Sequence, residues 1–186
     1  MIGDLDQRSG WPEELKTLLA RHPRETWAEH GTPMAQFWLE RHDEFRRHAA
    51  ALRDKTVEYH DDDESAEKTT VWIAPRLQGF LGALHGHHQI EDFHYFPAFR
   101  EAHKELASGF DALASDHELL HQNIVDIVGA FNALLDIVRA DRGANPDALK
   151  RASLAFVGTS ERMFRRLNRH LDDEEDLIIP VMLARD

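Results

Sequence analysis

The chain has 186 residues, which is enough for one domain with a sizeable hydrophobic core. Its 22 basic and 34 acidic residues give a formal net charge of −12, which argues against nucleic-acid binding, because phosphate recognition needs a basic face. The absence of cysteine excludes disulfides, thiolate nucleophiles and iron–sulfur ligation, whereas histidine occurs 13 times. The apolar stretches are too short for a membrane span and the start does not resemble a signal peptide, so we expect a cytoplasmic protein.

Helical periodicity predominates along the chain, and proline, glycine and polar segments divide it into helices. Residues 11–30 predict one or two short helices separated by Pro23. Thr32 is the expected N-cap of the first long helix, and Asn145 that of the last. Four long helices are expected over residues 33–56, 68–103, 109–140 and from 146 almost to the C-terminus, with loops at 58–67 and 141–144.

Long helices with short connections favour an all-α, up-down-up-down antiparallel four-helix bundle with a short helical N-terminal extension. We therefore divide the chain into an extension, residues 1–31, and a bundle, residues 32–186. Each long helix carries an apolar stripe with steps of three and four residues; in the third helix the predicted stripe runs through Ile124, Val128 and Leu135. Ionisable residues interrupt all four stripes: His42, His87, Glu91, His117, His121, His170 and Glu174.

The spacing of these residues predicts a metal site. Three of the four helices carry pairs at i and i+4, which lie on one helix face. In an up-down-up-down bundle all seven residues fall in one layer, about 15 Å from the same end at 1.5 Å rise per residue. Buried unpaired carboxylates are costly, and seven ligands are too many for one tetrahedral zinc. The layer therefore suits two six-coordinate metals that share carboxylates.

The second helix allows two registers, His87 with Glu91 or His88 with Asp92. An internal repeat of 83 residues aligns the segment from His87 to Pro97 with that from His170 to Pro180, which favours His87 and Glu91. His94 is expected either beside a carboxylate of the centre or exposed at the bundle end. The remaining histidines are expected on the surface or in loops: His22, His30, His48, His60, His85 and His103.

The segments RHDEF, HHQIEDFHYFP, DHELLH and HLDDEEDLIIP together resemble the hemerythrin-like, or HHE cation-binding, family. The resemblance is to the bacterial branch, because Glu174 follows His170 by four residues, whereas the oxygen carriers of invertebrates have Asp at the fifth. It implies a non-haem diiron site with an oxo or hydroxo bridge, in which zinc or manganese can substitute for iron. By position, His42 and His87 resemble the ligands of one iron, His117, His121 and His170 those of the other, and Glu91 and Glu174 the bridging carboxylates.

The resemblance implies reversible binding of dioxygen or a related small ligand, in sensing, storage or stress response. We favour this binding function over an enzymatic one. The alternatives are a diiron enzyme acting on oxygen, peroxide or nitric oxide, and a metal-controlled interaction module whose N-terminal segment contacts a partner. Superposing the first helix on the third aligns His42 with His117 and Arg46 with His121. The iron near His42 is therefore expected to have one histidine fewer and to carry the open position.

Overall fold

The structure is a computed structural model that describes residues 2–61, 66–141 and 145–184. Its long helices are α3 (Pro33–Asp61), α4 (Ala66–Ile90), α6 (Ala107–Asp141) and α7 (Pro146–Leu183). A π-helical turn, η3 (Glu91–Tyr95), joins α4 to α5 (Phe96–Ala102), and η4 (Lys104–Leu106) leads into α6. Every element in the described ranges is helical, so the predicted helical bundle is confirmed at this level.

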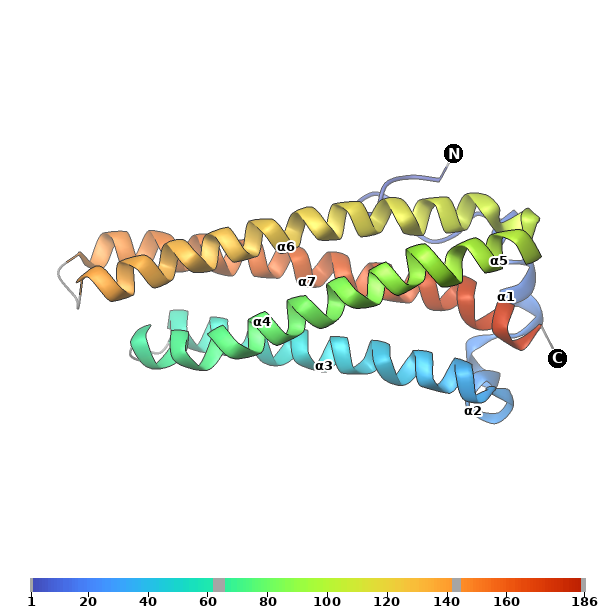
Figure 1. Cartoon of the computed structure of the whole chain (residues 1–186), viewed down its shortest axis with the longest axis horizontal. Coiled ribbons are helices and arrows are strands. Elements are labelled where there is room, and N and C mark those ends of the chain that lie inside the picture. Colours follow the sequence, from blue (N-terminus) through green and yellow to red (C-terminus); the bar gives the residue numbers. More distant parts are fainter. Residues whose placement is uncertain (1, 62–65, 142–144, 185–186) are drawn as a thin grey trace.

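The helices lie side by side along the length of the molecule (Figure 1). α3 contacts α4 and α7, and α6 contacts the same two helices. The colours in Figure 1 show that the chain reverses its direction from each long helix to the next. The Thr32 and Asn145 side chains accept hydrogen bonds from the amides of Ala35 and Ala148, at 3.2 and 3.0 Å, and so cap α3 and α7 as expected.

The predicted loop at 58–67 is too long. α3 continues to Asp61 and α4 begins at Ala66, while residues 62–65 lie outside the described ranges. The predicted turn at 141–144 falls mostly outside them as well, because α6 includes Asp141 and residues 142–144 are not described.

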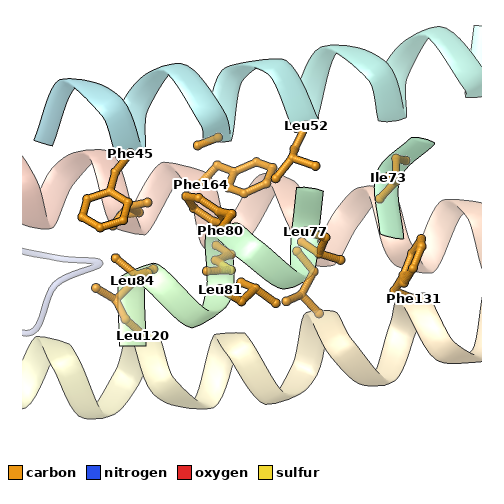
Figure 2. Packing of buried hydrophobic residues seen from close by; sticks show 14 of the residues in the cluster. Phe45, Leu52, Ile73, Leu77, Phe80, Leu81, Leu84, Leu120, Phe131 and Phe164 are labelled. Atoms are coloured by element: carbon orange, nitrogen blue, oxygen red, sulfur yellow. The ribbon is translucent and has the colours of Figure 1, made fainter. Parts of the chain in front are cut away.

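Two hydrophobic clusters form the core, one on each side of a polar layer. The first packs Phe45, Phe80, Leu84 and Phe164 between α3, α4, α6 and α7 (Figure 2). The second lies toward the N-terminal end of α3 and consists of Ala35, Trp38, Phe96, Phe99, Phe110, Leu113, Leu177 and their neighbours. Along the chain, most ionisable residues of the predicted site lie between positions that enter the two clusters: His42, His87, Glu91, His117 and Glu174.

The third helix is rotated relative to the predicted stripe. Val128 is 41% exposed, and His121 is exposed too. The buried positions instead follow a heptad spacing, Leu113, Leu120, Ile127 and Leu134. The predicted stripe is therefore wrong at His121 and Val128, which are exposed, whereas its members His117 and Phe131 are buried.

The N-terminal segment packs on the bundle. It contains η1 (Glu13–Leu15), α1 (Thr17–Arg21), η2 (Arg24–Thr26) and α2 (Trp27–His30), in keeping with the short helices expected there. Its apolar side chains Trp11, Leu15, Leu18 and Trp27 are buried in the second hydrophobic cluster. Among the described residues, no helix is both long enough and apolar enough to cross a membrane.

Candidate metal centre

The polar layer brings together side chains from all four long helices. The side chains form two groups that could each hold a metal ion, because the ligand atoms within each group lie within 4.8 Å of one another. One group consists of His42, His87, Glu91 and Glu174, and the other of His88, His117 and His170. All of these residues are buried except His87, whose side chain is 13% exposed.

Each glutamate faces both groups. Glu91 Oε1 lies 2.9 Å from His87 Nε2, while its Oε2 lies 3.5 Å from His117 Nε2. Glu174 Oε1 lies 3.5 Å from His42 Nε2, while its Oε2 lies 3.1 Å from His170 Nε2. Each carboxylate thus has one oxygen toward one histidine group and the other oxygen toward the second group. Carboxylates that bridge two cations require this arrangement.

The residues of the layer fit a metal because several of their atoms have no other partner. Six ligand atoms are buried without a hydrogen bond: Nε2 of His42, His87 and His88, both carboxylate oxygens of Glu91, and Oε2 of Glu174. The 2.9 Å approach of His87 to Glu91 is thus close, but it is not a hydrogen bond. Buried polar groups are normally satisfied, so this concentration of unpartnered nitrogen and oxygen atoms indicates a cation site.

Carboxylates outside the layer hold the other ring nitrogens of three histidines. His42 Nδ1 lies 3.0 Å from Glu175 Oε1, and His117 Nδ1 lies 2.8 Å from Asp92 Oδ1. His170 Nδ1 lies 3.4 Å from Asp116 Oδ2, which is long for a hydrogen bond. Such a partner fixes the tautomer and ring orientation of a metal-ligating histidine and leaves Nε2 for the metal.

The 83-residue repeat therefore has a chemical meaning. Glu91 and Glu174 enter the layer, and in each case the following acidic residue, Asp92 or Glu175, contacts a histidine on a neighbouring helix. Trp38 adds one further contact, because its indole N–H donates to Glu174 Oε1 at 2.8 Å.

The structure differs from the sequence-based assignment at one ligand. His121 belongs to neither group; it is exposed and lies against His85, with ring centroids 5.3 Å apart. Its place in the second group is taken by His88, whose ring stacks on His117 with centroids 4.1 Å apart. Arg46, which was aligned with His121, is partly buried and pairs with Glu175 and Asp172.

The π-helical turn begins at Glu91, where the two candidate registers end, and changes which residues beyond Glu91 face the core. The Phe96 N–H donates to the Glu91 carbonyl, five residues earlier. Pro97 favours this wider turn because it has no N–H to donate to the carbonyl of Phe93. The extra residue moves the inward stripe by one position, so Phe96 is buried whereas His94 is exposed. His94 thus lies outside the centre, which is one of the two positions expected for it from the sequence.

The charges of the metal-free layer are unevenly distributed. Burial and the neighbouring Glu174 raise the pKa of Glu91 well above its usual range. Burial opposes ionisation of Glu174 as well, but His42 and His170 outweigh it and hold that pKa well below the usual range. Burial lowers the pKa of His87 to about 3. The ring of His170 is also buried, yet Asp116 and Glu174 raise its pKa to about 9.

A helical bundle with a buried layer of imidazoles and carboxylates defines a cation-binding protein. Residues 34–182 match the model of the hemerythrin HHE cation binding domain, so the chain belongs to this family. No curated protein and no solved structure matches the chain.

Proposed function

We propose that this protein is a non-haem diiron protein that reversibly binds oxygen or a related small ligand. The observation that carries the proposal is the division of Glu91 and Glu174 between the two histidine groups, with one oxygen of each toward either group. In this proposal the bundle has an up-down-up-down arrangement over residues 32–186, and it works in the cytoplasm in sensing, storage or stress response.

One iron would be held by His42 and His87 and the other by His88, His117 and His170. Imidazole together with carboxylate is a donor set that suits iron, although zinc or manganese can occupy such ligands. When bound, iron supplies a redox-active centre to which a small ligand can attach. The chain itself keeps the donors buried, directs their Nε2 atoms inward and excludes water with two apolar clusters.

The small ligand is expected on the side of His42 and His87. This group offers two imidazoles, whereas the other offers three, so it leaves one position fewer filled by the protein. The rings of Trp38 and Phe45 lie against His87, with centroids 6.1 and 5.0 Å away. These aromatic walls favour a ligand of a few atoms over a larger polar substrate.

The ligand assignment is tested by substituting two histidines near His117: His88, whose ring stacks on it from α4, and His121, which follows it by one turn on α6. Iron-loaded wild-type protein is expected to hold about two irons per chain, measured by elemental analysis against protein concentration. His88→Ala is expected to reduce this number to about one or below, and the matched control His121→Ala to leave it unchanged. Loss of iron from His121→Ala with retention by His88→Ala would overturn the assignment.

The binding function is tested with azide as a probe on the ferric protein. Azide is expected to produce new visible absorption bands that disappear on dialysis. Oxygen should likewise be taken up by the reduced protein and released under vacuum without net consumption. Continuous consumption of oxygen, peroxide or nitric oxide would instead support the diiron enzyme.

A further inference from the structure

The N-terminal segment, residues 2–31, contacts the carboxylates that hold two of the metal-facing histidines. Arg8 is buried, at 7% exposure, and its guanidinium forms ion pairs with Asp116 and Asp173. Asp116 Oδ2 is the atom that also contacts His170 Nδ1. Arg8, Asp116 and His170 thus form a continuous chain from the segment into the layer.

A second arginine of the same segment reaches the other histidine group. Arg24 Nη1 lies 3.2 Å from Glu175 Oε2, and the opposite oxygen of Glu175 contacts His42 Nδ1 at 3.0 Å. Arg24 is also anchored on α7, where it donates to the Asp172 carbonyl and to Asp176 at 2.8 and 2.6 Å. Arg46 of α3 supports Glu175 as well, at 2.7 Å.

We propose that the N-terminal segment positions His170 and His42, with Arg8 acting through Asp116 and Arg24 through Glu175. The inference rests on the proposed metal centre and adds a part of the chain that lies outside residues 34–182, the range of the family match. Because His170 and His42 belong to different groups, one segment orients ligands of both metals.

The physical reason is the geometry of a supported carboxylate. A carboxylate that accepts a hydrogen bond from a ligating imidazole determines where that ring points, and loss of such a partner typically weakens metal binding by about 10- to 100-fold. Asp116 is a buried carboxylate that needs a partner of opposite charge, and Arg8 supplies this partner through two hydrogen bonds. Without Arg8, the carboxylate is expected to shift and His170 to rotate.

The same segment has a contact that can serve as a control. Asp6 pairs with Arg166 on α7, with Oδ1 2.8 Å from Nε, and neither residue touches a carboxylate of the centre. Asp6→Asn therefore loosens the segment on α7 while it leaves Asp116 and Glu175 in place.

The test uses the full chain loaded with cobalt(II), whose visible absorption reports the geometry of its ligands. Arg8→Gln is expected to speed the transfer of metal to a chelator by about 10- to 100-fold and to change the cobalt spectrum. Arg24→Gln should have a smaller effect of the same kind, because Arg46 still holds Glu175. Asp6→Asn should leave the spectrum and the release rate unchanged.

A double-variant cycle separates positioning from general destabilisation. If Arg8 acts through Asp116, Arg8→Gln should have no further effect on metal release in an Asp116→Asn background. Equal effects of Arg8→Gln in both backgrounds, or equal release from Arg8→Gln and Asp6→Asn, would overturn the proposal. Failure of wild-type protein to bind cobalt would count against the metal centre itself, and is thus distinguished from failure of the segment's role.

Discussion

Individual residues of the layer titrate far from their usual pH range in the metal-free protein. Burial disfavours protonation of His87 and lowers its pKa to about 3, and it lowers the pKa of His88 well below the usual range. His170 is equally buried but is surrounded by carboxylates, which raise its pKa to about 9. Neighbouring histidines of the same layer therefore affect folding stability with opposite signs.

The metal-free protein is expected to be most stable near pH 6.5. Below that pH the unfolded chain protonates His87 and His88, whereas the folded chain does not, so each histidine lowers stability by up to about 1.4 kcal/mol per pH unit. Glu91, whose raised pKa lets the folded chain take up a proton first, offsets part of this loss. Above that pH, the stabilisation from His170, which is fully present below its unfolded pKa of about 6.5, is lost as the pH rises through about 9. Urea unfolding between pH 5 and 9 measures the profile.

The acidic side of this profile has a matched control. His88→Gln should reduce the loss of stability below pH 6.5, whereas His85→Gln, at an exposed position on the same helix, should leave the profile unchanged. A profile of His88→Gln identical to that of wild-type protein would contradict the attribution to buried histidines.

Trp38 contributes a second effect at the scale of one residue. Trp38→Phe keeps an aromatic ring but removes the N–H that donates to Glu174 Oε1. The buried oxygen loses its donor, and we expect the free energy of unfolding of metal-free protein to fall by about 1–3 kcal/mol. Trp27→Phe is the control, since its indole donates to the His22 carbonyl. Both variants should be less stable, but only Trp38→Phe should change the cobalt spectrum.

At the scale of elements, the π-helical turn determines how α4 and α5 face the bundle. In a straight α-helix, positions four and seven residues after Glu91 would share its face. The turn adds one residue, so the buried positions are Phe96 and Phe99, five and eight residues later. α7 also contains a proline, Pro180, yet it is α-helical from Pro146 to Leu183. The two copies of the 83-residue sequence repeat therefore differ in backbone conformation.

Deletion of Phe93 tests the turn, because this residue is 73% exposed within it. A straight α-helix without Phe93 would keep Phe96 and Phe99 toward the core, so the helical content measured by circular dichroism should be retained. The contact of Asp92 with His117 should change, and cobalt should be released at least several-fold faster.

Deletion of Val125, an exposed residue of α6, provides the comparison. It lies within a regular α-helix, so its removal rotates Ile127 and Leu134 by about 100° relative to Leu120. This variant should fail to fold stably. Equal tolerance of both deletions would show that the π-helical turn has no special role.

For the whole molecule, the polar layer lies between two hydrophobic clusters and interrupts the core. Its unpartnered nitrogen and oxygen atoms make the metal-free layer unfavourable. A metal that binds only the folded state stabilises it by about 2.7 kcal/mol at a concentration one hundred times Kd. Metal binding and folding are therefore expected to be strongly linked.

Removal of the metal by a chelator should lower the melting temperature by at least about 5 °C, which is the shift expected for this free energy in a chain of this size. Differential scanning calorimetry, with metal loss confirmed by elemental analysis, measures the change. Iron or zinc should restore the original value. Calcium should not, because it prefers oxygen ligands. An unchanged melting temperature after complete metal loss would contradict the linkage.

The sequence alone determined the helices, the polar layer and most of its members. Proline, glycine and capping residues limit helices locally, and histidines or glutamates within an apolar stripe are recognisable without a structure. Six of the seven ligand positions predicted from these signals lie in the two groups: His42, His87, Glu91, His117, His170 and Glu174.

Tertiary structure decided the remaining features, because they depend on how each helix is rotated and on contacts between distant segments. Each residue turns an α-helix by about 100°. A small error in the predicted rotation of α6 therefore assigns a buried position to an exposed residue, as happened with His121. The packing of α4 and α6 brought His88 into the layer. The contacts of Arg8 with Asp116 and Asp173 join residues more than 100 positions apart, and no local pattern in the sequence specifies such pairs.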